Sequence, residues 1–160
     1  GIEYSGFLFF GLINVDSNPF VIEYNVRLGD PETQVIMPRI QSDLIPVLMA
    51  MGDPDQFKKN ELIISADSAT TIIITSGGYP EKYETGHAVS GLSDITNATV
   101  FHAGLKLENG KYLTNGGRVL AVTAQGKNIK EAIVQSYENV NKIAFNDSYF
   151  RKDIGLDVIK

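Results

Sequence analysis

The pattern of apolar and polar positions over the first part of the chain predicts a strand hairpin. Residues 4–13 and 20–28 are rich in aromatic and branched side chains, and the turn formers of residues 14–19 separate them. Two such runs joined by a short polar turn are typical of an antiparallel hairpin. We therefore expect residues 4–28 to fold as two paired strands.

Helix signals follow the second run. Asp30 can cap free backbone N–H groups, Pro31 suits a first helical position, and Glu32 suits the positive end of a helix dipole. Pro38 should end or kink that helix, because a proline inside a helix removes a hydrogen bond. A second helix is predicted over residues 42–52.

The pattern changes to short strands after the polar connector of residues 52–60. Runs rich in β-branched and aromatic residues are separated by Gly, Asn and Pro. These runs are residues 62–66, 69–76, 87–92, 98–107, 111–113 and 118–124. Strands at this spacing predict a small antiparallel sheet or barrel. We expect two domains, residues 1–60 and residues 61–160.

One longer helix is predicted near the end of the chain, within residues 126–145. Asn128 with Glu131 three places later resembles a capping box. Apolar side chains then recur at helical spacing: Ile129, Ala132, Ile133, Tyr137, Val140 and Ala144. One face of this helix should pack on the sheet. The predicted fold class is α+β.

Composition narrows the classes of function. The 160 residues carry a net charge of −5, which argues against non-specific nucleic-acid binding. No apolar run is long enough to cross a membrane, so no membrane partner is expected. There is no cysteine, which excludes a disulfide framework and a thiolate zinc site. Because the first residue is Gly, we expect a processed form or an excised piece of a longer protein.

Polar side chains interrupt the second predicted strand. Side chains alternate between the two faces of a strand, so Glu23, Asn25 and Arg27 share one side, about 7 Å apart from one to the next. The other side is apolar and should pack into a core; it comprises Ile22, Tyr24 and Val26. A solvent-facing strand edge would explain the polar row equally simply.

The chemistry of this row also suits a metal–phosphate site. Glu23 and Asn25 offer the oxygen ligands that Mg²⁺ prefers, and Arg27 offers a planar fork for a carboxylate or phosphate. Gly29 would let a ligand approach closely, and a helix starting at Pro31 would point N–H groups at an anion. A helix start alone explains the Gly-Asp-Pro-Glu run nearly as well.

Other candidate groups are weaker. Residues 114–118, "TNGGR", could cradle a phosphate with Arg118 beside it, although a hairpin turn is the commoner meaning of Asn-Gly. His102 lies in an apolar run, where a packed, hydrogen-bonded side chain is expected, and His87 is expected in a loop. Neither histidine lies in a motif typical of hydrolases or metal-binding helices.

Several segments, taken together, resemble one family. The segment "EYNVRLGDPETQ", followed in order by "SGGYPEKYETG", "VFHAGLKL", "TNGGRVLAVTA" and "FRKDIG", is similar to phosphoribosylamine–glycine ligase, also called glycinamide ribonucleotide synthetase. The resemblance covers essentially the whole chain. It implies the end of an ATP-grasp large lobe, made of antiparallel strands plus helices. A small antiparallel β-barrel-like domain with a packed C-terminal helix should follow.

The resemblance also implies an activity. Enzymes of this family use ATP to phosphorylate the glycine carboxylate, and the amine of 5-phosphoribosylamine then attacks the acyl phosphate. The products are glycinamide ribonucleotide, ADP and phosphate, in de novo purine biosynthesis. A cytoplasmic, magnesium- or manganese-dependent ligase is implied. Phosphoryl transfer depends on positioning and charge neutralisation and needs no covalent nucleophile.

Site residues follow from the resemblance by position. Glu23 and Asn25 match the family's metal ligands, which hold Mg²⁺ or Mn²⁺ against ATP. Arg27, Gly29 and Asp30 match the part of the motif near the substrates, with Arg27 as an anion-binding and catalytic residue and Asp30 as a weaker catalytic candidate. Arg118 is an expected substrate contact.

The family enzyme is far longer than this chain. The missing N-terminal part of the same enzyme is therefore an expected partner, and the chain alone is expected to be inactive. The alternative is a non-catalytic structural or binding module that braces a neighbouring domain. Residues 7–10, "FLFF", are expected to form a core strand, although in a fragment the surfaces that the missing lobe covers would be exposed.

Overall fold

The computed structural model describes residues 1–159 and divides the chain into two compact units. The first unit is Gly1–Ser65, and the second begins at Ala66. The boundary expected after residue 60 lies a few residues before this division. Each unit has its own sheets and helices, and each is described by itself.

The first unit opens with an antiparallel hairpin, as predicted. Strand β1, Phe9–Val15, pairs with strand β2, Asn18–Asn25. The two turn residues, Asp16 and Ser17, have φ angles of 50° and 65°. Positive φ at both central residues is the geometry of the tight turns that suit the twist of a hairpin.

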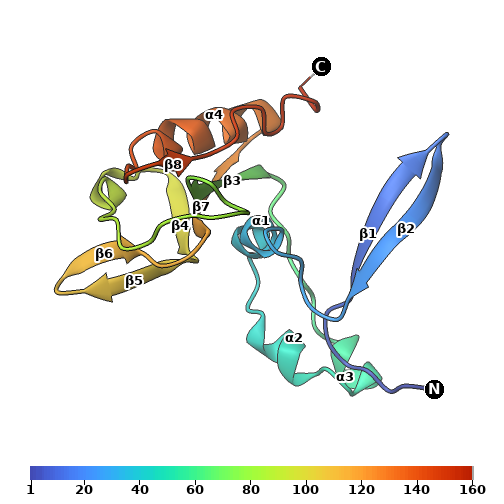
Figure 1. Cartoon of the computed structure of the whole chain (residues 1–160). Helices are drawn as coiled ribbons and strands as arrows, with labels where there is room; N and C mark the ends of the chain where they lie inside the picture. The colour runs from blue at the N-terminus through green and yellow to red at the C-terminus, as the bar shows by residue number, and fades with distance from the viewer. Residues whose placement is uncertain (160) are drawn as a thin grey trace. The chain divides into compact units, whose positions relative to one another are not determined.

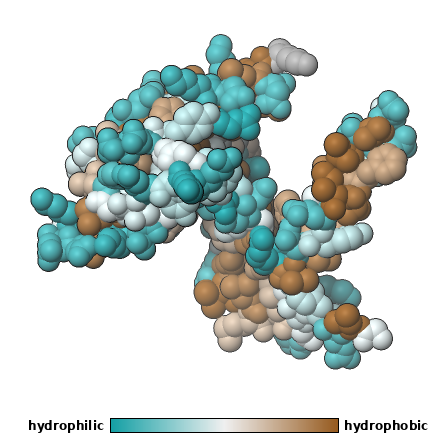
Figure 2. All heavy atoms as spheres, viewed as in Figure 1, coloured by the Kyte–Doolittle hydropathy of each residue, from teal (hydrophilic) through white to brown (hydrophobic). Residues whose placement is uncertain are grey.

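The apolar side of β2 is exposed, which corrects the sequence prediction. Ile22, Tyr24 and Val26 were expected to pack into a core, yet they are 66%, 64% and 68% exposed. Figure 2 shows apolar side chains on the surface of this hairpin. Alternation along a strand fixes which residues share a side, but a two-stranded ribbon has no third layer that would cover that side.

Short helices follow the hairpin in the first unit (Figure 1). They are α1, Thr33–Ile36; the 3-10 helix η1, Met37–Arg39; α2, Ile45–Met49; and α3, Pro54–Phe57. The predicted start at Asp30 and Pro31 is wrong. Residue Glu32 precedes α1 without a side-chain cap, and the backbone N–H of Thr33 bonds back to the Gly29 carbonyl at 3.0 Å. Residues 29–33 thus form a turn ahead of the helix.

The second predicted helix is present but shorter than expected. An Asp43 carboxylate oxygen accepts from the Ile45 N–H at 2.9 Å, and Pro46 lies in the first turn, where proline is tolerated. The connector expected over residues 52–60 contains helix α3. Asp53 caps this helix by accepting from the N–H groups of Asp55 and Gln56, each at 3.1 Å.

The second unit is built on an antiparallel sheet of four strands in the order β4-β7-β3-β8. These strands are β3, Ser68–Ser76; β4, Ala98–His102; β7, Arg118–Gly126; and β8, Ser148–Tyr149. A separate hairpin pairs β5, Leu105–Glu108, with β6, Lys111–Thr114. A short 3-10 helix, η2, spans Leu92–Asp94.

Three of the six strands predicted after residue 60 are confirmed, and three differ. Residues 62–66 contribute only an isolated bridge at Ile64, and residues 87–92 contribute only bridges at Ala88 and Ser90. The predicted strand 98–107 is divided into β4 and β5 after His102. Within residues 1–159 the sheets stay open, so the expected barrel-like domain is an open sheet with a hairpin beside it.

Helix α4, Ile129–Val140, packs on β3 and β7 as its pattern predicts (Figure 1). The predicted capping box forms in part: Asn128 Oδ1 accepts from the Glu131 N–H at 3.0 Å, but Glu131 Oε2 accepts from the N–H of Lys127, at 3.0 Å, instead of that of Asn128. The core beneath the helix comprises Ile72, Ile74, Val119, Leu120, Val122, Val140, Ile143 and Phe145.

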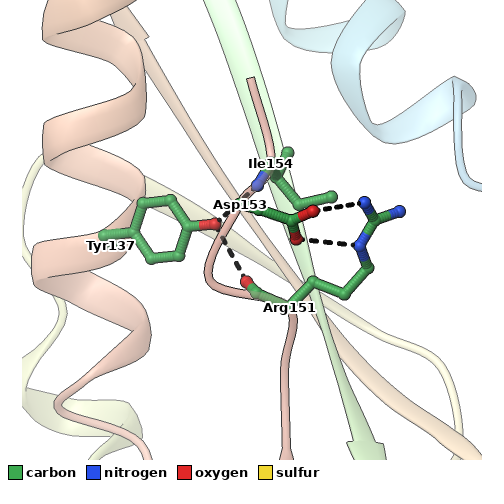
Figure 3. Close-up of polar contacts among 4 residues, drawn as sticks. All are labelled: Tyr137, Arg151, Asp153 and Ile154. Carbon is green, nitrogen blue, oxygen red and sulfur yellow. Dashed lines mark hydrogen bonds and ion pairs between the residues drawn. The ribbon is translucent and has the colours of Figure 1, made fainter. Parts of the chain in front are cut away.

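The segment after β8 returns to α4 through polar contacts (Figure 3). The Tyr137 hydroxyl donates to the Arg151 carbonyl at 2.9 Å and accepts from the Ile154 N–H at 3.0 Å. Arg151 also binds the Asp153 carboxylate through two nitrogens, at 3.0 and 2.7 Å. We call residues 151–154 the C-terminal hook.

Candidate functional site

The candidate site begins at the end of β2. Asn25 Nδ2 donates to Glu23 Oε1 at 3.1 Å, so the two side chains meet on one side of the strand, as their spacing predicts. Glu23 is exposed and Asn25 is half-buried. A carboxylate and an amide are thus adjacent, and both can be reached from solvent.

Gly11 on the neighbouring strand makes room for this pair. Gly11 lies opposite Glu23 in the hairpin register, immediately before the bulge between Gly11 and Leu12. A Cβ atom at Gly11 would come within 2.8 Å of the Glu23 Cγ atom. Gly11 was not predicted as part of the site, although a glycine inside a strand pattern often marks a bulge or a close approach.

Arg27 lies outside the strand that was expected to hold it. Strand β2 ends at Asn25, so the predicted row of three polar groups loses its regular alternation after the amide. The Arg27 side chain is exposed and donates from Nη1 to the Leu28 carbonyl at 2.9 Å. Its guanidinium is thus held by the backbone of the next residue.

In the turn after β2, a side chain of the same turn fills the space beside Gly29. Gly29 is buried, and a Cβ atom there would overlap the Glu32 carboxylate, so the glycine accommodates Glu32. Asp30 Oδ1 accepts from Gln34 Nε2 at 3.4 Å. The predicted anion site at a helix start on Pro31 is wrong, because α1 has one turn and begins at Thr33.

The Glu23–Asn25 pair suits a metal that a nucleotide also holds. Carboxylate and amide oxygens are hard donors, and Mg²⁺ commonly takes one or two protein ligands and completes its shell with phosphate and water. No group of three or more His, Cys, Asp and Glu that could hold an ion occurs in the part of the chain that the structure describes. These residues therefore fit Mg²⁺ or Mn²⁺ only together with other ligands.

Arg118, the remaining predicted site residue, belongs to the second unit. It is the first residue of β7 and is half-buried. The preceding residues 115–117 connect β6 to β7, which belong to different sheets, so the hairpin turn predicted from the Asn-Gly pair is wrong. Arg118 pairs with Thr75 across the sheet, next to a register shift in β3.

The two histidines lie apart in the second unit. His87 lies in the loop between β3 and β4, as predicted, with Nε2 3.7 Å from Glu84 Oε2. His102 ends β4 and is exposed, so the expected packed histidine is wrong. Its ring stacks edge-on against Tyr112 with centroids 5.0 Å apart. Neither arrangement resembles a nucleophile–base pair.

Comparison with known proteins decides the family. The family described as "Phosphoribosylglycinamide synthetase, C domain" matches residues 69–157. The chain belongs to this family. Phosphoribosylamine–glycine ligase from Allochromatium vinosum is 46% identical over 160 residues, which cover 97% of this chain and 37% of that protein. The ligase from Fusobacterium nucleatum is 40% identical over 158 residues and covers 96% of this chain.

A solved member of the phosphoribosylglycinamide synthetase family has the same fold. The crystal structure of phosphoribosylamine–glycine ligase from Thermotoga maritima superposes with a TM-score of 0.75 at 30% identity. The match covers 91% of this chain and 36% of that chain. The chain thus spans a little over a third of the length of these relatives and includes their C domain.

No helix among residues 1–159 is long and apolar enough to cross a membrane.

Proposed function

We propose that this chain supplies one side of the active site of an ATP-dependent ligase that joins glycine to 5-phosphoribosylamine in purine biosynthesis. Family membership supports the reaction. The single observation that carries the site is the contact between Glu23 and Asn25 at 3.1 Å on an exposed strand end. Residues 1–60 would form the C-terminal part of an ATP-grasp domain, and residues 61–160 would form the C-terminal domain of the ligase. A cytoplasmic location belongs to the same proposal.

Glu23 and Asn25 would hold Mg²⁺ or Mn²⁺ bound to ATP. The ion supplies charge neutralisation at the phosphate oxygens during phosphoryl transfer. Asn25 now directs its amide N–H at the Glu23 carboxylate, so metal binding requires the amide oxygen to face the ion in place of that N–H. The carboxylate–amide contact keeps both side chains on one side of β2 in the absence of the ion.

Arg27, Gly29 and Asp30 would lie beside the reacting groups. The Arg27 guanidinium is a planar fork that can bind a phosphate or carboxylate oxygen once it leaves the Leu28 carbonyl. Gly29 and Asp30 shape the turn next to it, with Asp30 the weaker candidate for a direct role. Arg118 would contact an anionic group of a substrate from the second unit.

The remaining nucleotide and substrate contacts would come from the N-terminal part of the same enzyme. The chain by itself is therefore inactive in this proposal, and ATP-dependent formation of glycinamide ribonucleotide by it would contradict that. The alternative function is a non-catalytic module that braces a neighbouring domain. The β1–β2 hairpin exposes apolar side chains, and such surfaces often mark a contact with another domain. They favour a bracing role in addition to catalysis.

The experiment that tests the proposal replaces both metal ligands in the full-length enzyme. Glu23→Ala with Asn25→Ala should weaken binding of the magnesium–ATP complex about tenfold or more, because one charged and one neutral ligand are lost. Binding is measured by titration calorimetry, with Asn18→Ala at the far end of β2 as the matched control. Unchanged affinity of the double variant would mean that these side chains do not hold the metal.

A further inference from the structure

Glycine-rich loops of the second unit meet at one end of its sheet. They are residues 77–79 after β3, residues 103–104 between β4 and β5, and residues 115–117 before β7. A Cβ atom at Gly104 would come within 2.8 Å of the Gly116 Cα atom and 2.6 Å of the Arg118 carbonyl oxygen. Backbones approach this closely only where side chains are absent.

Hydrogen bonds fix one edge of the turn before Arg118. The buried Ser76 donates its N–H to the Gly117 carbonyl at 2.8 Å and its hydroxyl to the Gly116 carbonyl at 2.9 Å. On the other edge, the Gly104 N–H donates to the Arg118 carbonyl at 2.8 Å. The two glycines have few conformational restraints of their own, so their geometry depends on these neighbours.

Tyr79 covers Gly117, the residue directly before Arg118. A Cβ atom at Gly117 would overlap the Tyr79 ring, which shows that the ring lies against the Gly117 Cα atom. Tyr79 is 40% exposed, so its ring lies at the surface and does not belong to the buried core. Tyr83, four residues later in the same loop, is also 40% exposed, with its ring centroid 6.1 Å from that of Tyr79.

From these contacts we propose that Tyr79 is a positioning residue for Arg118. Its ring restrains the Gly116–Gly117 turn, and the turn sets where β7 begins and therefore where the guanidinium of Arg118 points. The inference rests on the proposed function, in which Arg118 contacts an anionic substrate group. According to this inference, the contact between Arg118 and the substrate depends on the Tyr79 ring, which itself touches no substrate. The phosphate of 5-phosphoribosylamine is the anion that we assign to Arg118.

The test measures steady-state kinetics of the full-length enzyme with each substrate varied in turn. Tyr79→Leu should raise the KM for 5-phosphoribosylamine about tenfold and leave the KM for magnesium–ATP within twofold, because a misplaced anion-binding group weakens one substrate selectively. Tyr79→Phe keeps the ring and should stay close to the wild type. Tyr83→Leu is the matched control, since Tyr83 has the same exposed fraction, whereas the three atoms nearest to a Cβ at Gly117 all belong to Tyr79.

Arg118→Ala separates the inference from the function on which it rests. If Arg118→Ala leaves all KM values unchanged, the substrate contact is wrong, and the positioning role is wrong with it. If Arg118→Ala raises the KM for 5-phosphoribosylamine but Tyr79→Leu does not, only the positioning role is wrong. If each variant alone raises the KM for 5-phosphoribosylamine, Tyr79→Leu should raise this KM little further in the Arg118→Ala background.

A purely structural role for Tyr79 has a different outcome. It would lower the thermal unfolding midpoint and raise the KM values of all substrates together, and that result would overturn the inference. If Tyr79→Leu does not fold, Tyr79→Met replaces it, because methionine fills a similar space with a flexible chain and no planar ring. The same selective rise in KM is expected from that variant.

Discussion

At the scale of single residues, the proposed metal site depends on a glycine that carries no chemistry. Gly11 lies opposite Glu23, and its missing side chain leaves the space that the Glu23 side chain occupies. The Glu23 carboxylate in turn accepts from Asn25, so a shift at Gly11 would pass to both proposed ligands. Strand register, rather than proximity in sequence, creates this dependence.

We predict that Gly11→Ala in the full-length enzyme raises the KM for magnesium–ATP about threefold to tenfold, because a 2.8 Å contact forces the Glu23 side chain to move. Steady-state kinetics at varied magnesium–ATP measure the effect.

A double-mutant cycle supplies the control for this prediction. In the Glu23→Ala background the alanine at position 11 has no carboxylate side chain to displace, so Gly11→Ala should cause little further change. Equal effects of Gly11→Ala in both backgrounds would show that the glycine acts through the hairpin backbone instead.

At the scale of elements, the C-terminal hook fastens the last segment to α4. Tyr137 holds the backbone on both sides of the hook, and the Arg151–Asp153 pair closes it (Figure 3). The Arg151 guanidinium, which hydrogen-bonds the carboxylate, lowers the pKa of Asp153 below its ordinary value of about 3.8. The pair is exposed, so its contribution to stability is small.

The direction of this pKa shift predicts a pH dependence. A lowered pKa in the folded state means that the carboxylate adds stability above its unfolded pKa, and that this stability is lost as the pH falls through the folded pKa. Asp153→Asn should therefore lower the free energy of unfolding slightly at neutral pH and have no effect in strong acid. Urea unfolding at several pH values measures the difference.

Asp157→Asn is the matched control for the hook, because Asp157 is an exposed carboxylate in the same segment. Its effect should not follow the pH profile of Asp153→Asn. A difference between wild type and Asp153→Asn that persists in acid would show that the asparagine acts through something other than the lost charge.

At the scale of the whole molecule, the two units differ in how they are stabilised. Nearly all fully buried apolar side chains belong to β3, β7 and α4 of the second unit. The β1–β2 hairpin of the first unit exposes apolar side chains on both of its faces, including Phe10 and Leu12 on one face and Ile13 and Phe20 on the other. A two-stranded hairpin without a covering layer is marginally stable in water.

We therefore predict a steep difference in amide hydrogen exchange along this chain. Amides of β3 and β7 should exchange only through global opening of the second unit, and those of β1 and β2 at least about 100-fold faster through local opening. Mass spectrometry of peptides from each strand measures the rates. The β5–β6 hairpin is an internal comparison, because it also has two strands. Equal protection of β1 and β7 would contradict this account.

The sequence by itself determined the features that depend on local spacing. Period-two alternation put Glu23 and Asn25 on one side of β2, and their contact confirms it. The Asn128 cap and the apolar face of α4 followed from local spacing and are confirmed. These features need only neighbours within a few residues, so sequence patterns contain them.

The tertiary structure alone decided which faces are covered and which glycines touch. Sequence spacing could not show that Ile22 and Tyr24 remain exposed, because burial depends on whether another layer is present. Nor could it place Gly11 against Glu23 or Tyr79 against Gly117, since strand register and loop packing join residues far apart in the chain. Local features depend on residues that are close in the sequence. A site depends on contacts between distant residues, and only the folded chain makes those contacts.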